Sequence, residues 1–402
     1  MTLRIHYFNP GHETAILLDE ANYTPPTNVQ RMIRELALLP AWYADKGDYV
    51  FVEELLSPRF ISLLPNELRP FGVPISRKEL LTKGKKLPAM QAAPWGVSPQ
   101  SVRFFQLLKE TCNWQLDVPE WKEAYLPLTG RQTAAHCLEK IQLLLPDISF
   151  PVSPRFCVKE KEIEKYIRLC NAPFVMKTPY SSSGRGLRWL KERKLTEKDR
   201  TWIRGAFNKQ GTLSIECGVD KAQDLAMEFY SDGQGTVRFE GLSFFSTEEN
   251  GAYIGNCLES QNSFQQLLVS SIGEENCRRI QEAVTEALRE AVGSVYTGYL
   301  GVDMILYHDG KGGMKLHPCV EINMRYTMGL LAQRLFERYI HPSSIGDFRI
   351  TYDSKPGEAY ERHRFMKDAY PQHILDGKLK EGYQALCPVT KDTGFRAYML
   401  VM

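Results

Sequence analysis

Two carboxylates, an amide and an arginine in the last third of the chain have the types and spacing of a metal and phosphate site. Residues 299–306 alternate in polarity as a strand does, and a second strand-like run, after a polar turn, ends with Glu321 and Asn323. Because side chains alternate along a strand, pairing of these strands would let Asp303, Glu321 and Asn323 converge. Their hard oxygen ligands suit Mg²⁺, and Arg325 follows where a cation can meet a phosphate. A solvated acidic hairpin is the alternative interpretation.

A second candidate site is a small polar loop that follows a lysine. Residues 174–177 are expected to form a strand that ends at Lys177, and residues 187–190 the returning strand. Lys177 can add a point charge to a bound phosphate. The loop between the strands offers hydroxyls and backbone N–H groups that can approach phosphate oxygens closely: Ser181, Ser182, Ser183, Gly184, Arg185 and Gly186. Its order differs from the P-loop and from the dinucleotide-binding glycine motif. A hairpin loop without a ligand is the alternative.

Length and composition limit the classes to which the chain can belong. The 402 residues are too many for one core and suit two or three domains. A hydrophobic fraction of 43% and a net charge of +2 give no reason to expect a nucleic-acid or membrane partner. The nine scattered cysteines indicate reduced thiols in a reducing compartment, and no signal-peptide pattern opens the sequence. We therefore expect a cytoplasmic protein.

The elements that must position these residues alternate between strands and helices. At the amino terminus, a strand over residues 3–8 runs into a turn with His12 and Glu13, which could face a substrate or simply be solvated. Nearer the hairpin, strands are expected over 212–218, 225–230 and 237–245, followed by an amphipathic helix over 271–293. Ser98 and Pro99 form a helix start, as N-cap and first helical residue.

As a set, these motifs resemble the ATP-grasp superfamily over roughly residues 150–335. The resemblance rests on the lysine at a strand end, the Ser/Gly loop, Ile-Glu-Cys-Gly at 215–218, Gly-Tyr-Leu-Gly-Val-Asp at 298–303 and Glu-Ile-Asn-Met-Arg at 321–325. It implies an α/β (α+β grasp) fold in which an N-terminal α/β domain precedes a two-subdomain ATP-grasp domain. The implied ranges are 1–125 for the N-terminal domain, 126–402 for the ATP-grasp domain, about 155–215 for its nucleotide lid and about 216–402 for its C-terminal subdomain.

The resemblance also implies a role for each candidate residue. Lys177 would touch the ATP phosphates under the 181–186 loop, and Glu216 and Cys217 would border the adenine, largely through backbone groups. Asp224 is the candidate for the ribose hydroxyls. Mg²⁺, or Mn²⁺ in its place, would be held by the three residues Asp303, Glu321 and Asn323, with Arg325 facing the transferred phosphate or an acyl phosphate. Many ligases of this family carry an arginine at the position of Gly301, so a second cation must come from elsewhere, for which Arg238 is the candidate.

The expected activity follows from this set of groups. An ATP-dependent ligase would activate a carboxylate as an acyl phosphate and join it to an amine or a thiol, releasing ADP and phosphate. The alternatives are an ATP-grasp kinase that phosphorylates a small-molecule hydroxyl and a non-catalytic nucleotide-binding regulator. The expected partners are small-molecule carboxylate and amine substrates, and an oligomer is compatible with the sequence.

Overall fold

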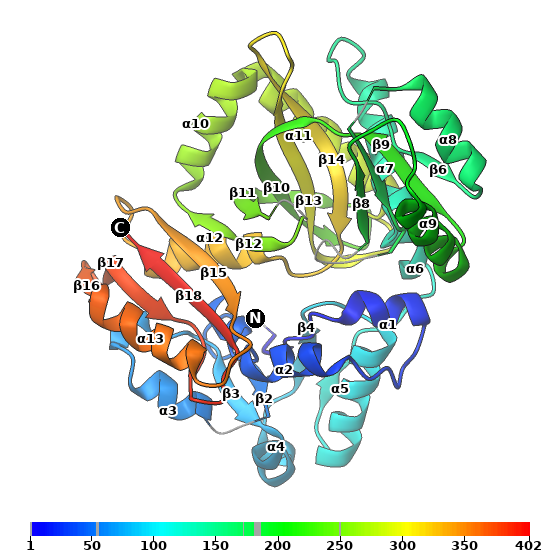
Figure 1. Cartoon of the computed structure of the whole chain (residues 1–402). Helices are drawn as coiled ribbons and strands as arrows, with labels where there is room; N and C mark the ends of the chain where they lie inside the picture. Colours follow the sequence, from blue (N-terminus) through cyan, green and yellow to red (C-terminus); the bar gives the residue numbers. More distant parts are fainter. Residues whose placement is uncertain (1, 54–55, 172, 181–185, 249–250) are drawn as a thin grey trace. The chain divides into compact units, whose positions relative to one another are not determined.

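The computed structural model describes residues 2–53, 56–171, 173–180, 186–248 and 251–402. They form two compact units (Figure 1), of which unit 1 is 1–123, 254–261 and 325–402, and unit 2 is 124–253 and 262–324. The predicted boundary after residue 125 lies beside the first change of unit. The predicted domain 126–402 differs from these compact units, because its last residues cluster with the N-terminal ones.

The N-terminal part of unit 1 is built on a parallel sheet in the order β3-β2-β1-β4-β5. Its strands are β1 (Arg4–Tyr7), β2 (Tyr49–Val52), β3 (Val73–Ser76), β4 (Met90–Pro94) and β5 (Leu116–Asp117). The chain builds the sheet outward in one direction from β1 to β3, and β4 begins the other direction. The strand order therefore reverses between β1 and β4. Open α/β sheets bind ligands outside the carboxyl ends of their strands at such a reversal.

The helices of this part are α1 (His12–Leu18), α2 (Thr27–Glu35), α3 (Leu56–Ser62), α4 (Arg77–Lys83) and α5 (Pro99–Cys112), with short 3₁₀ turns η1 (Leu39–Trp42), η2 (Asn66–Leu68) and η3 (Gly84–Lys86). The predicted start of α5 is confirmed, since the Ser98 hydroxyl accepts a hydrogen bond from the Ser101 N–H. Successive residues of β2 belong to two different hydrophobic clusters, Phe51 to one and Val50 to the other. Both faces of a parallel sheet are normally buried in this way.

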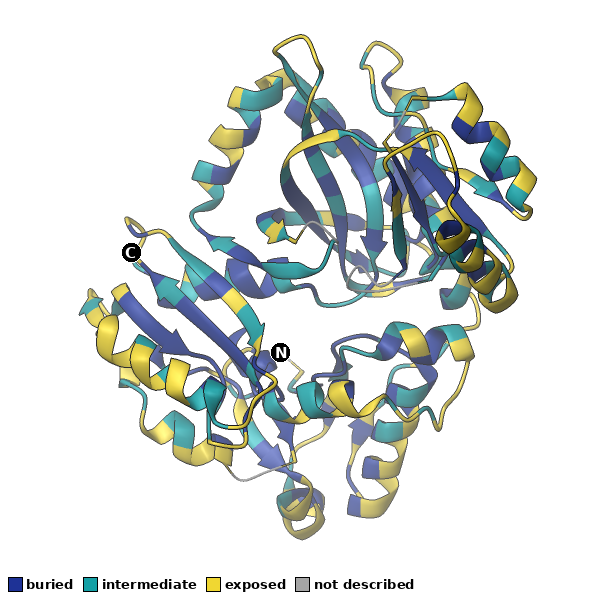
Figure 2. Cartoon of the chain, viewed as in Figure 1, coloured by how far each residue is buried: buried dark blue, intermediate teal, exposed yellow. Residues whose placement is uncertain are grey.

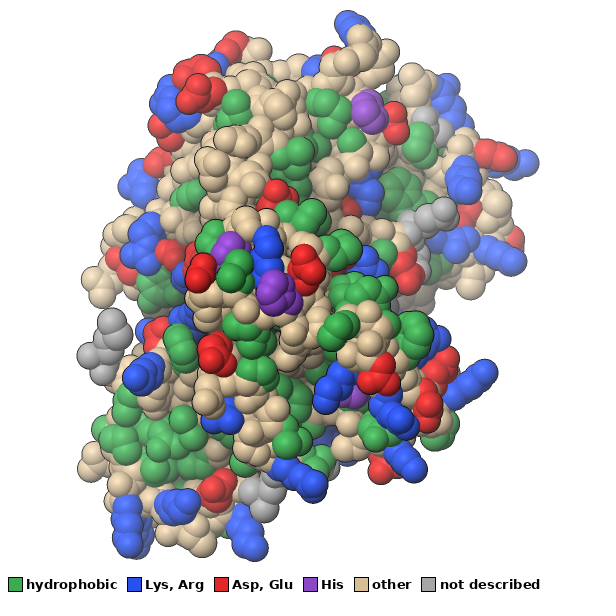
Figure 3. Space-filling model, turned by 90° about the vertical axis from the view of Figure 1, so that its left-hand side faces the viewer, with side chains coloured by type: hydrophobic (Ala, Val, Ile, Leu, Met, Phe, Trp, Pro, Cys, Tyr) green, Lys and Arg blue, Asp and Glu red, His purple; other side chains and the backbone are tan. Residues whose placement is uncertain are grey.

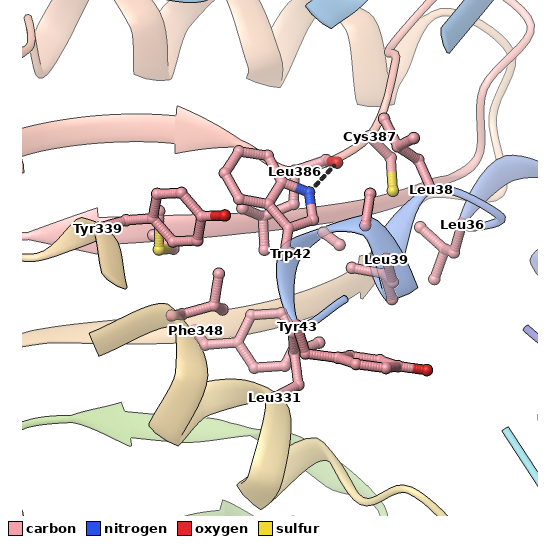
Figure 4. Packing of buried hydrophobic residues seen from close by; sticks show 14 of the residues in the cluster. Leu36, Leu38, Leu39, Trp42, Tyr43, Leu331, Tyr339, Phe348, Leu386 and Cys387 are labelled. Carbon is pink, nitrogen blue, oxygen red and sulfur yellow. Dashed lines mark hydrogen bonds between the residues drawn. The ribbon is translucent and has the colours of Figure 1, made fainter. Parts of the chain in front are cut away.

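An antiparallel sheet completes unit 1, in the order β12-β15-β18-β17-β16. Its strands are β12 (Tyr253–Leu258), β15 (Gly346–Tyr352), β16 (His373–Leu375), β17 (Lys378–Ala385) and β18 (Phe395–Val401), with helices α12 (Met328–Tyr339) and α13 (Glu358–Ala369). Figure 4 shows Trp42 packed among residues of this part, with its indole N–H donating to the Leu386 carbonyl at 2.7 Å. The Trp42 ring also meets Tyr339 edge-on, with centroids 5.1 Å apart. This shared core explains why the last residues of the chain cluster with the first.

Unit 2 contains two antiparallel arrays of strands and their covering helices. The first is ordered β6-β9-β7-β8 and the second β14-β13-β10-β11. The strands are β6 (Arg155–Cys157), β7 (Phe174–Lys177), β8 (Leu187–Leu190), β9 (Leu213–Cys217), β10 (Asp220–Asp232), β11 (Val237–Thr247), β13 (Thr297–His308) and β14 (Met314–Asn323). The helices are α6 (Tyr125–Leu128), α7 (Arg131–Leu144), α8 (Glu160–Leu169), α9 (Glu197–Gln210), α10 (Gln261–Ile272) and α11 (Glu274–Ala291).

The predicted helix over 271–293 begins later than expected. Gly273 has a φ of 86° and separates α10 from α11, because a right-handed helix cannot continue through a positive φ. Burial follows the elements in both units: Figure 2 shows strands that are mostly buried and an exposed outer face on α13. No helix among the described residues is long and apolar enough to cross a bilayer.

Candidate active site

The hairpin of β13 and β14 brings together the predicted metal-binding residues. The two strands pair antiparallel, with Asp303 directly opposite Glu321 and Gly301 opposite Asn323. The Asn323 side-chain N–H donates to the Asp303 carboxylate at 3.1 Å. Alternate residues of β13, such as Val302, are fully buried on the opposite face, which fixes the register. The predicted convergence of the two carboxylates and the amide is therefore present in the structure.

Lys177 is buried at the end of β7 and forms an ion pair with Glu216 on the neighbouring strand β9. Burial acts to raise the pKa of the Glu216 carboxyl, but the charge of Lys177 outweighs it, so that the pKa lies below its usual value. His317, on β14, is itself buried, and this burial lowers its pKa to about 4. Near neutral pH the group is thus an ammonium, a carboxylate and a neutral imidazole. Glu216 contributes a side chain to this group, beyond the backbone contacts expected of it.

Arg131, at the first position of α7, is a functional candidate that the sequence analysis missed. Its guanidinium lies 3.2 Å from the Glu321 carboxylate and donates to the Thr178 carbonyl at 3.1 Å. Its backbone N–H donates to the Pro179 carbonyl at 3.1 Å. The side chain is only 9% exposed. Arg131 therefore joins the predicted metal ligand to the backbone that follows Lys177. Nothing near it in the sequence marks it, because its partners lie about 50 and 190 residues away.

The two ends of the predicted phosphate loop are anchored. The Thr178 N–H donates to the Gly186 carbonyl at 2.9 Å, and Gln210 exchanges two hydrogen bonds of 2.9 Å with the Tyr180 backbone. The first bond joins the two ends of the loop, and the other two hold Tyr180 beside Gln210, the last residue of α9. The other candidates of the loop, Ser181, Ser182, Ser183, Gly184 and Arg185, lie outside the described residues, and their role stays a prediction.

Two other candidates, Asp224 and Cys217, lie on β10 and β9. Asp224 is buried on β10, two residues from Ala226, which pairs with Asp303; it therefore shares the face of Asp303 and accepts a hydrogen bond from Thr247 at 2.7 Å. Cys217 is exposed at the end of β9, with its sulfur 3.8 Å from the Tyr166 hydroxyl.

The structure does not bring Arg238 to the group. Arg238 pairs across the sheet with Tyr230 on β10. Tyr230 is four residues from Ala226, the partner of Asp303, so Arg238 lies about 13 Å from Asp303 along the strand direction. Its guanidinium instead forms an ion pair with Glu240 at 2.7 Å. Arg131, rather than Arg238, is the additional cation beside Glu321.

Arg325 belongs to unit 1, where it contacts Glu13 in the first turn of α1. Its Nε donates to Glu13 at 2.8 Å, and both side chains are about one-fifth exposed. The next residue of the chain, Tyr326, donates its backbone N–H to the Trp95 carbonyl after β4 at 2.9 Å. Arg325 therefore meets the carboxyl ends of β1 and β4, where the strand order reverses.

Among the described residues, no three His, Cys, Asp or Glu side chains gather in a way that could hold a metal ion. On the face drawn in Figure 3, the described acidic and basic side chains are interspersed and form no large area of one sign. The two carboxylates and the amide of the hairpin therefore remain the donor set to consider.

Comparison with known proteins identifies the fold. No family model matches the sequence, and no curated protein sequence matches it. Among solved structures, the chain is similar to biotin carboxylase from Campylobacter jejuni in a β-γ-ATP complex, with a TM-score of 0.54 and 15% identity over 100% of this chain and 88% of the other. It is also similar to the biotin carboxylase domain dimer of the Hydrogenobacter thermophilus 2-oxoglutarate carboxylase, with a TM-score of 0.53 and 13% identity over 100% and 86%. The chain has the ATP-grasp fold, as the motifs implied.

Proposed function

We propose that this protein is an ATP-dependent ligase that activates a carboxylate as an acyl phosphate and joins it to an amine or a thiol, releasing ADP and phosphate. The observation that carries the proposal is the register that sets Asp303 opposite Glu321 with Asn323 hydrogen-bonded beside them. The fold supports this proposal. The similar C. jejuni structure is a complex with β-γ-ATP, and the similar H. thermophilus domain was solved with MgADP, ADP and bicarbonate.

The donor set fits a hard divalent cation. Two opposed carboxylates and an amide oxygen are ligands that Mg²⁺ accepts, and phosphate oxygens and water normally complete its shell. When bound, Mg²⁺ would neutralise phosphate charge. The Arg131 guanidinium, 3.2 Å from Glu321, adds a positive charge beside this donor set. These chemical preferences support Asp303, Glu321 and Asn323 as the proposed holders of Mg²⁺.

The chain's own side chains have defined tasks in this proposal. Lys177 and Arg131 would bind phosphate oxygens, and Asp224 would bind the ribose hydroxyls on the face it shares with Asp303. The backbone of the 178–186 segment would cover the phosphates and exclude water from an acyl phosphate, which water would otherwise hydrolyse. Arg325 would hold the transferred phosphate while the nucleophile attacks. These roles require no covalent intermediate on the protein.

The test is trapping of the acyl phosphate. Purified protein is incubated with ATP, Mg²⁺, hydroxylamine and a panel of small carboxylic acids, and the products are identified by mass. The expected result is a hydroxamate of one acid, formed together with ADP and phosphate and absent when ATP is omitted. A phosphorylated hydroxyl compound without hydroxamate would indicate a kinase, and AMP with pyrophosphate would exclude an acyl-phosphate mechanism.

A further inference from the structure

The sheet β6-β9-β7-β8 of unit 2 has two faces with different surroundings. Phe174, Met176 and Ile215 lie on one face, in a hydrophobic cluster with residues of α8 and α9. Because side chains alternate along a strand, Lys177 on β7 and Glu216 on β9 lie on the other face, where they form their ion pair. This second face is therefore the one that a nucleotide would meet in the proposed function.

Trp189, on the edge strand β8, lies on the same face as this ion pair. It pairs directly with Val175, which in turn pairs with Glu216, so the three side chains form one row across the strands. Trp189 is two residues from Leu187, the partner of Lys177, so its row lies about 7 Å from that of Lys177 along the strand direction. Trp189 is 44% exposed, although the other two members of its row are buried.

The Trp189 ring crosses the sheet surface toward the end of β9. A Cβ at Gly218 would lie 3.0 Å from the Trp189 Cζ3 atom and 3.2 Å from the Pro173 Cγ atom. Since β7 lies between β8 and β9, the indole must extend over β7 to reach Gly218. The glycine allows this approach because it has no side chain. One side of the indole thus rests against the backbone, and its exposed area belongs to the other side.

We propose that Trp189 forms one wall of the adenine site, with the base stacked on the exposed side of the indole. The inference rests on the proposed function, in which Lys177 binds the phosphates and the backbone of Glu216 and Cys217 borders the base. Gly218 follows this backbone directly, so a base that lies along it comes next to the indole. Every base has a π face that can stack on an aromatic ring. Trp189 therefore contributes affinity for the base and none for the phosphates.

A purely structural role for Trp189 leads to a different expectation. An indole that only covered the backbone at Gly218 would stabilise the fold. Its removal would then weaken the binding of every ligand of the site to a similar degree, or of none. A stacking surface affects only those ligands that carry a base. ADP and inorganic tripolyphosphate, which has no base, therefore distinguish the two roles.

The first test is calorimetric titration of the full chain with ADP and with tripolyphosphate, both in the presence of Mg²⁺. In Trp189→Ala, the Kd for ADP should rise about tenfold, or roughly 1.4 kcal/mol, as the stacking surface is lost. The Kd for tripolyphosphate should stay within about twofold of wild type, because phosphates do not stack. Trp189→Phe keeps an aromatic face, so its Kd for ADP should rise less than about threefold.

Tryptophan fluorescence gives a second readout, which does not depend on the truncated variant. ADP should quench the emission of wild type as the base stacks on the indole, and this quench should be absent in Trp189→Phe. Trp202→Phe is the matched control. Trp202 lies on α9 and packs against the cluster on the opposite face of the sheet, so its variant should keep the quench.

Several results would overturn the inference: an ADP affinity that Trp189→Ala leaves unchanged, an equal rise of both Kd values, or a quench that persists in Trp189→Phe. Circular dichroism checks the fold of Trp189→Ala, and if that variant does not fold, the fluorescence of Trp189→Phe decides. Hydroxamate formation with an ADP affinity independent of Trp189 would leave the ligase standing and reject the wall. Base-dependent binding through Trp189 without any hydroxamate would keep the wall and reject the ligase.

Discussion

Each unit of this protein sets an arginine against a glutamate, but the two pairs are built differently. In unit 2, Arg131 lies 3.2 Å from Glu321, which is placed by the register of a hairpin that buries Val302 on its opposite face. In unit 1, Arg325 lies 2.8 Å from Glu13, which stands in the first turn of α1, after a loop whose Asn9 is hydrogen-bonded to Gly96. The Arg131 side chain is 9% exposed, whereas Arg325 and Glu13 are each about one-fifth exposed.

The difference separates a rigid site from an adjustable one. A one-residue slip of β14 would turn Glu321 and Asn323 to the other face and expose the apolar residues between them, so the hairpin has one stable register. The loop of unit 1 depends on a few hydrogen bonds and on the absence of a side chain at position 96. Substitutions in the hairpin should therefore change chemistry and leave the fold intact, whereas substitutions in the loop should change both.

The largest effect is expected for Glu321→Gln. The variant keeps the shape of the side chain and removes the charge that would hold Mg²⁺, so turnover should fall on the order of 100-fold or more. The fold should persist. The measurement is thermal stability with ATP alone and with ATP plus Mg²⁺, where the Mg²⁺-dependent gain of wild type should shrink in the variant.

A matched control for this prediction is Glu275→Gln. Glu275 is an exposed glutamate on α11 that pairs with Arg278, and exposed pairs of this kind contribute little to stability. Glu275→Gln should match wild type both in turnover and in the Mg²⁺-dependent gain of thermal stability. If Glu321→Gln gains as much stability from Mg²⁺ as wild type does, Glu321 is not a metal ligand and the hairpin is a solvated acidic face.

A smaller but still large effect is expected for Lys177→Met. The variant removes a phosphate-binding cation and leaves the Glu216 carboxylate buried without its partner, which costs about 3–5 kcal/mol. Adding Glu216→Gln should recover most of the stability and none of the ATP affinity. Denaturant unfolding and calorimetric titration with ATP measure the two quantities. If the double variant binds ATP with unchanged affinity, Lys177 does not bind phosphate and only pairs with the buried Glu216.

The smallest effect is expected for Gly96→Ala, in the loop that follows β4. A Cβ there would overlap the His12 ring, so unit 1 should lose about 1–3 kcal/mol of stability as the ring is displaced. Gly205→Ala is the matched control, because no atom lies within 4 Å of a Cβ at this helical position. That control should gain about 0.5–1 kcal/mol from the higher helix propensity of alanine. Equal stability of the two variants would show that the close contact between Gly96 and His12 is not needed.

The sequence alone determined the parts that depend on local pattern. Period-two alternation predicted β13, β14 and their pairing, and with it the convergence of Asp303, Glu321 and Asn323. The order of weak motifs indicated the ATP-grasp fold that the structural comparison supports. These features are readable because strand polarity and turn residues act over a few positions of the chain.

Only the tertiary structure decided which distant groups meet. It placed Arg131 against Glu321, 190 residues away, and left Arg238 far along β11, although both arginines look alike in the sequence. It also paired Lys177 with Glu216 across β7 and β9, and grouped residues 325–402 with the N-terminal sheet. Contacts of this kind depend on strand order and on the packing of a shared core around residues such as Trp42, and neither leaves a periodic signal in the sequence.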